Sequence, residues 1–68
     1  MVIARRIIMT VKEFKKTEMC KQATEVRYFD MNDVEITNKP TIILNLLPVI
    51  GTGHNTDGSI DVTVQYIE

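Results

Sequence analysis

The segment Ile60-Asp-Val-Thr-Val-Gln-Tyr-Ile-Glu68 gives the clearest structural signal in this chain. Apolar side chains alternate with polar ones along it, which is the period of two typical of a β-strand with one buried face. Residues 51–58 precede it as a turn-rich loop that ends in Asp-Gly, a strong hairpin signal. Because the apolar run 41–47 precedes this loop, the sequence predicts a β-hairpin over residues 41–67.

A second hairpin is predicted over residues 23–37. Residues 23–30 and 34–37 contain β-branched and aromatic side chains that favour strands. Between them, Asn32 and Asp33 tolerate the positive φ that a tight turn demands. Pro40 then separates this hairpin from the next strand, because proline has no N–H to donate to a central ladder.

The first 22 residues allow two interpretations. Residues 2–11 alternate in a way that favours a strand, with Ile3, Ile7 and Met9 on one face. The tetrapeptide Thr10-Val-Lys-Glu13 instead matches a helix capping box, from which a helix would extend over residues 11–22. We expect a strand over residues 2–11, followed by a short helix or a polar loop.

The predicted fold class is therefore mainly β, or α+β if a short helix forms near residues 11–22. We expect one small antiparallel sheet or open barrel of four to five strands, with hairpins at about 23–37 and 41–67. A chain of 68 residues predicts a single small domain, 1–68.

Small size implies a need for extra stabilisation. A domain of this length buries only about 60% of its unfolded surface, and its core supplies roughly 3–5 kcal/mol. Cys20 is the only cysteine and His54 the only histidine, so we expect no internal disulfide, no metal site and no cofactor. Self-association or a protein partner is the remaining source of support.

Localisation is inferred from the apolar segments and the single thiol. Arg5 and Arg6 interrupt the apolar N-terminal stretch, so we expect no cleavable export signal. The apolar runs are far shorter than the roughly 20 residues that cross a bilayer. A lone cysteine suits a reducing compartment, and we expect a cytoplasmic protein without a membrane span.

An interaction surface is predicted from strands that are apolar on both faces. Residues 41–47 have this character and residues 2–11 nearly so, yet a one-layer sheet of this size cannot cover both faces itself. Barrel closure, a helix or a second copy of the chain can provide the cover, and exposed apolar surface generally marks a contact. The predicted partner or self-interface consists of Ile3, Ile7, Met9, Ile43 and Leu47.

A nucleic-acid surface is the first alternative. Residues 1–21 carry six basic and two acidic side chains, a surplus of +4 in a chain whose net charge is −1. Such a segment can bind single-stranded nucleic acid when rings such as Tyr28 and Phe29 stack on bases, but this surplus is small for phosphate binding. The residues of this alternative are Arg5, Arg6, Lys12, Lys15, Lys16, Lys21 and Phe14.

A site for a small anionic ligand or nucleotide is the second alternative. Backbone N–H groups of a glycine-containing loop can face a phosphate, but this loop lacks the Lys-Ser or Lys-Thr ending of a P-loop and precedes a strand. We predict no catalysis, because His54 has no second histidine or recognisable orienting group. The residues of this alternative are Gly51, Gly53, His54, Asn55 and Asp57.

In kind, a short β-rich chain with few motifs resembles the accessory proteins of bacteriophages and mobile elements. The resemblance implies that the protein acts by docking on a larger enzyme. We therefore expect a non-enzymatic protein-binding module, a homodimer, that modulates or inhibits a larger protein.

Overall fold

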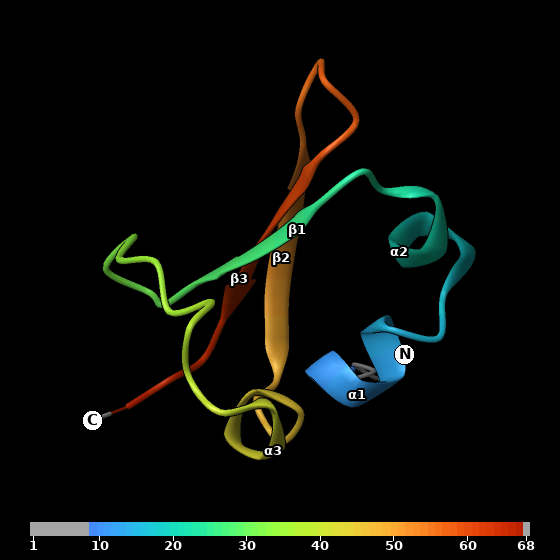
Figure 1. Ribbon diagram of the computed structural model, residues 1–68. Helices are drawn as coiled ribbons and strands as arrows, with labels where there is room; N and C mark the ends of the chain where they lie inside the picture. The colour runs from blue at the N-terminus through green and yellow to red at the C-terminus, as the bar shows by residue number, and fades with distance from the viewer. Residues whose placement is uncertain (1–8, 68) are drawn as a thin grey trace, which may run out of the picture.

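A three-stranded sheet organises the computed structural model, which describes residues 9–67 (Figure 1). Its strands, in the spatial order β1-β3-β2, are β1 (Val26–Phe29), β3 (Ile60–Val64) and β2 (Val49–His54). The helices are α1 (Val11–Phe14), α2 (Glu18–Gln22) and α3 (Thr41–Leu44). No helix within the described residues has the length and apolar character needed to cross a membrane.

The central strand β3 forms two kinds of pairing. It runs antiparallel to β2, with Thr52 opposite Val62, and this pair confirms a hairpin in the C-terminal third. It runs parallel to β1, with Tyr28 also opposite Val62. The sheet is therefore mixed, whereas the sequence predicted an antiparallel one. The predicted count of four to five strands is not confirmed, because the described residues form three strands in an open sheet.

The predicted strand 41–47 is wrong, because α3 forms there instead. Pro40 occupies the N-cap position, and its carbonyl accepts a hydrogen bond from the N–H of Leu44 at 3.1 Å. A short apolar run fits either a buried strand or one turn of helix, so periodicity alone cannot separate them. The first strand of the hairpin is consequently β2, which begins at Val49, and it includes glycines that the sequence assigned to the loop.

The capping box at Thr10 is confirmed. Its Oγ1 accepts from the N–H of Glu13 at 3.3 Å, and its own N–H donates to Glu13 Oε1 at 3.1 Å. A second cap follows, because Thr17 Oγ1 accepts from the N–H of Cys20 and begins α2. Two short helices thus replace one helix over residues 11–22. Most of the predicted strand 2–11 lies outside the described residues, and Val11 belongs to α1.

The predicted hairpin 23–37 forms only in part. The turn after β1 has the expected geometry, with Asp33 at a φ of 67°. The returning arm makes an isolated antiparallel bridge between Phe29 and Glu35, and the N–H of Ile36 donates to the carbonyl of Tyr28 at 2.7 Å. It is therefore a bridge along the edge of β1 and not a further strand.

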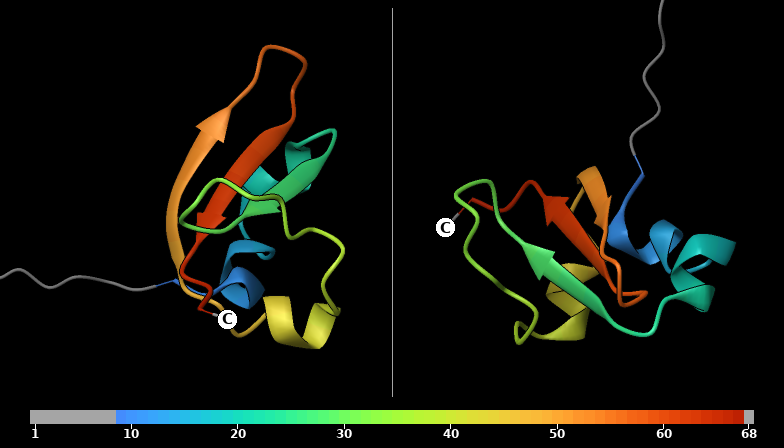
Figure 2. Two further views of the ribbon diagram at one scale, coloured as in Figure 1. Left: turned by 90° about the vertical axis from the view of Figure 1, so that its left-hand side faces the viewer. Right: turned by 90° about the horizontal axis from the view of Figure 1, so that it is seen from above.

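The core lies on one face of the sheet. Paired residues of neighbouring strands share a face, so Tyr28 and Val62 point to the same side. α1 and α2 lie beyond one side of the sheet in both views (Figures 1 and 2). Arg27 and Asp61, one position along, point to the other face and form an ion pair at 3.4 Å. The buried apolar residues are Val11, Phe14, Tyr28, Ile36, Leu44, Ile60, Val62 and Val64.

Two alanine substitutions test whether residues 41–47 are helical. Leu44 is buried and Leu46 is exposed, whereas in a strand both would share one face. Leu44→Ala is expected to lower the free energy of unfolding by about 2–5 kcal/mol, and Leu46→Ala by less than about 0.5 kcal/mol. Urea unfolding followed by circular dichroism measures both, and equal effects would contradict α3.

Candidate functional site

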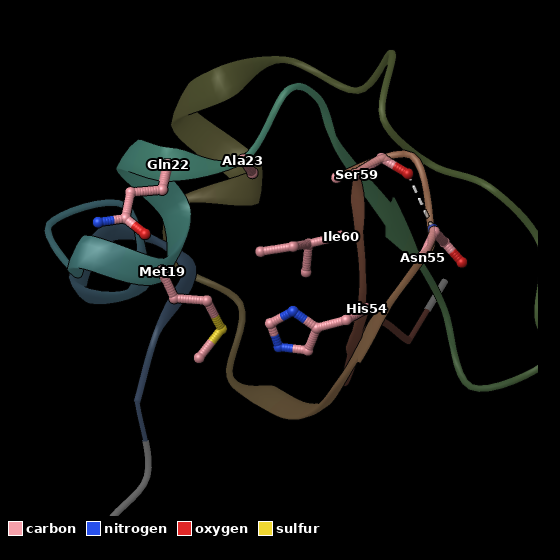
Figure 3. A pocket seen from close by; sticks show the side chains of 8 residues that line it. Met19, Gln22, Ala23, His54, Asn55, Ser59 and Ile60 are labelled. Carbon is pink, nitrogen blue, oxygen red and sulfur yellow. Dashed lines mark hydrogen bonds between the residues drawn. The ribbon is translucent and has the colours of Figure 1, made fainter.

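A hollow of about 200 Å³ separates α2 from the β2–β3 hairpin. Met19 and Gln22 of α2 line one side, and His54 and Ile60 of the hairpin line the other. Figure 3 shows the His54 imidazole and the Met19 thioether facing the same space. This hollow contains part of the predicted ligand loop, so its polar atoms decide whether the loop can bind a ligand.

Ser59 holds the end of the hairpin together from a buried position. Its Oγ accepts hydrogen bonds from Arg27 Nη2 and from Asn55 Nδ2, both at 2.9 Å. The same hydroxyl donates to Asp57 Oδ1 at 2.7 Å. A serine hydroxyl has one donor and two acceptor positions, so every position is used. Ser59 therefore acts as a structural group in this turn, and its oxygen is not free to attack a substrate.

The carboxylate of Asp57 is tied to the same turn. Hydrogen bonds from the hydroxyl and then from the backbone N–H of Ser59 hold the pKa of Asp57 below its usual value, because they favour the charged form. A negative charge is thereby fixed at the tip of the hairpin. An anionic ligand that approached this loop would meet that charge.

The backbone of the loop also offers few free donors to an anion. The N–H of Asn55 donates to the carbonyl of Ser59 at 3.0 Å, and the N–H of Gly58 donates to the carbonyl of Asn55 at 3.1 Å. Gly51 and Gly53 belong to β2 and lie outside the tip. Of the predicted ligand residues, His54 and Asn55 therefore line the hollow, whereas Gly51, Gly53 and Asp57 do not, although Asp57 is linked to Asn55 through Ser59.

Within the described residues, His54 has no neighbouring side chains that would form a catalytic or metal-binding site with it. Its side chain is exposed and makes no hydrogen bond with residues 9–67. The described part of the chain contains no group of three or more His, Cys, Asp or Glu side chains placed to hold a metal ion. Cys20 is half-buried against the core. Among the described residues, the hollow therefore contains no acid, base or set of metal ligands arranged for catalysis or metal binding.

The pKa of Asp57 leads to a test by pH. Because the folded-state pKa is lowered, Asp57 stabilises the fold above its unfolded-state pKa, and this contribution disappears as the pH falls through the folded-state value. Asp57→Asn is expected to be less stable than the wild type at pH 7, with a difference that closes below the ordinary aspartate pKa of 3.8. Urea unfolding at pH 7, 5 and 3 measures it.

Ser59→Ala supplies the control for this measurement. The substitution removes the hydroxyl that makes the largest contribution to the lowered pKa. In that background, the pH-dependent effect of Asp57→Asn should shrink. An unchanged effect would show that another group controls the carboxylate.

Exposed aliphatic side chains gather on the outer side of α3 and the turn that follows it. Ile42 and Leu46 are each 75% exposed and Ile43 is 40% exposed. We call these three residues the α3 apolar face. Because α3 is helical, Leu44 and Leu47 turn inward to the core while this face turns outward.

The residues of the predicted interface lie in different parts of the structure. Ile43 lies on the α3 apolar face, whereas Met9 and Leu47 pack half-buried against the core. Ile3 and Ile7 lie outside the described residues. Ile42 and Leu46 were not predicted as surface residues, although an apolar i, i+4 pair after a proline is compatible with a helical turn.

The basic segment presents charge without aromatic rings. Its described lysines, at positions 12, 15, 16 and 21, are exposed, and Arg5 and Arg6 lie outside the described residues. Phe14 and Tyr28 are buried in the core, so neither ring can stack on a base. Burial, with a smaller effect of Cys20, raises the pKa of Tyr28. Phe29 is only half-buried, but one such ring makes a poor stacking platform.

Comparisons with protein-family models, with curated proteins and with solved structures give no match for this chain. The function of the chain is therefore inferred from its own surfaces and charges. Of these, the α3 apolar face includes two of the most exposed aliphatic side chains within residues 9–67, Ile42 and Leu46.

Proposed function

We propose that this protein is a protein-binding module that self-associates through the α3 apolar face and modulates a larger partner protein. The observation that carries the proposal is the exposure of Ile42 and Leu46 on the side of α3 opposite the buried Leu44. A contiguous patch of exposed apolar side chains generally marks an interaction site. Within residues 9–67 nothing covers the outer side of α3.

The chemistry of the α3 apolar face suits a second copy of the chain. Residues 40–54 contain no Asp, Glu, Lys or Arg, so the segment that carries this face brings no like charges of its own to a two-fold contact. A two-fold contact is self-complementary, since the same side chains lie on both partners. α3 stands at the end of the sheet where β2 begins, and its outer side is open to approach (Figure 1).

The magnitude of the contact predicts a weak dimer. Complete burial of an Ile or Leu side chain stabilises by roughly 1.5–3 kcal/mol, so Ile42 and Leu46 from two copies supply about 6–12 kcal/mol. Association costs about 4–15 kcal/mol in lost freedom. The two ranges overlap, and their most favourable difference, about 8 kcal/mol, corresponds to a dissociation constant of roughly 1 μM, so any dimer is weak.

Modulation or inhibition of a larger protein is supported by the resemblance in kind to bacteriophage and mobile-element accessory proteins. The polar alternatives have less support, because the buried Phe14 and the fixed charge of Asp57 oppose nucleic-acid and anion binding respectively. A cytoplasmic setting remains a prediction, supported by Cys20 as the only cysteine.

Light scattering coupled to size-exclusion chromatography tests the proposal. The mass of the wild type is expected to rise from monomer towards dimer between about 10 μM and 1 mM, following the weak affinity above. The double variant Ile42→Ser/Leu46→Ser should stay monomeric throughout, because its contact surface is polar.

A matched control is available in Ile67→Ser. Ile67 is 76% exposed, like the two residues replaced in the double variant, but it lies after β3 and not on α3. It should self-associate as the wild type does. A wild type that remains strictly monomeric at 1 mM, or a double variant that associates normally, would refute the α3 interface.

A further inference from the structure

A second hollow, of about 410 Å³, opens beyond the ends of β1 and β3. The two strands are parallel, so their carboxyl ends meet at one edge of the sheet. The turn 30–34 follows β1, and residues 66–67 follow β3, and both segments line the hollow. Figure 2 shows the segment after β3 passing beside the turn after β1. Ligands of open sheets with parallel strands commonly bind at this end.

The walls of the hollow combine polar groups of Asp30 and Asn32 with exposed aliphatic side chains. Met31 is 52% exposed, Val34 is 56% exposed and Ile67 is 76% exposed, although all three line the same concavity. Tyr66 adds a half-buried aromatic ring. Exposed aliphatic groups around a concavity form the type of surface that receives an aliphatic side chain of a partner.

A buried carboxylate belongs to the lining. Asp30 is only 8% exposed, and its Oδ1 accepts hydrogen bonds from the N–H of Asn32 at 2.8 Å and of Val34 at 3.0 Å. Its backbone N–H donates to the carbonyl of Val34 at 2.9 Å, which closes the turn. The carboxylate is therefore held in place before any partner arrives, and its second oxygen accepts no hydrogen bond from residues 9–67.

The charge of Asp30 has no partner among the described residues. The ion pair within residues 9–67 joins Arg27 to Asp61 and does not involve Asp30. Nearby Asp33 and Glu35 add negative charge, and the one cation close to the hollow, Lys39, lies 5.4 Å from the centre of the Tyr66 ring. Lys39 thus contacts a lining residue, but no ion pair within residues 9–67 joins it to Asp30. A partner that covers this carboxylate meets a desolvation cost unless it brings a cation to pair with it.

We propose that this hollow binds a segment of the partner protein in which an arginine or lysine lies next to a bulky aliphatic residue. The aliphatic side chain packs against Met31, Val34 and Ile67, and the cation pairs with the free oxygen of Asp30. This contact deepens the proposed function by naming the chemistry of the partner. It uses none of the α3 apolar face, so it stands if self-association fails.

Fluorescence anisotropy with a labelled peptide that carries one arginine between two leucines tests the contact in the full-length protein. Asp30→Asn keeps the Oδ1 acceptor and therefore the turn, but it removes the charge. Because a desolvated charge pair contributes more than a rim pair, binding is expected to weaken at least about tenfold. Ile67→Ser should weaken it about threefold to tenfold through lost apolar contact.

Asp33→Asn is the matched control. It removes the same charge from the same turn, and asparagine tolerates the positive φ at this position, but Asp33 does not line the hollow. It should change the affinity by less than about twofold, in line with a screened surface charge. A peptide with glutamine in place of arginine should lose about tenfold with the wild type and little with Asp30→Asn.

Each other outcome contradicts the proposal. Equal effects of Asp30→Asn and Asp33→Asn would show general attraction of a cation, and absence of binding by the wild type at millimolar peptide would remove the site. A lower mass of Asp30→Asn in light scattering would assign the hollow to a second copy. The Ile42→Ser/Leu46→Ser variant should bind the peptide as the wild type does, so the two proposals fail separately.

Discussion

The burial of β3 is the constraint on which the rest of the structure depends. Its inward side chains, Ile60, Val62 and Val64, are all buried, and both of its edges pair with a neighbouring strand. The neighbours run in opposite directions, so each fixes a different part of the molecule. The antiparallel β2 determines the hairpin tip, while the parallel β1 places the Asp30 turn beside Tyr66. Both the rigid tip and the open hollow follow from this one strand.

Features determined by neighbouring residues were predictable from the sequence. The alternation in β3, the capping box at Thr10 and the positive φ at Asp33 all depend on local sterics and hydrogen bonds. The parallel pairing of β1 was not predictable, because it joins residues more than 30 positions apart through shared burial. The predicted strand over residues 41–47 was wrong for another reason. An apolar run gives no period, and only the core around Leu44 selects the helix.

The candidate surfaces were less accessible to sequence reasoning than the fold. Residues two positions apart share a face in a strand but not in a helix. Leu44 and Leu46 were therefore expected on the same face, whereas in the structure Leu44 is buried and Leu46 is exposed. Phe14 was also misassigned. Its ring was expected at a nucleic-acid surface because the segment is basic, but it is buried in the core where α1 packs on the sheet. The burial of Asp30 has no local signal at all. It results from the closed turn and from residues that arrive with β3.

The two surfaces differ in a way that suggests different roles. The α3 apolar face lies within residues 40–54, which contain no Asp, Glu, Lys or Arg, so it contributes affinity with little discrimination between partners. The second hollow combines aliphatic walls with the buried carboxylate of Asp30, and a partner that buries this charge without supplying a cation incurs a large penalty. Such a penalty against wrong partners is a source of specificity. A chain this small can therefore combine weak self-association with selective recognition, because the two properties reside in separate side chains.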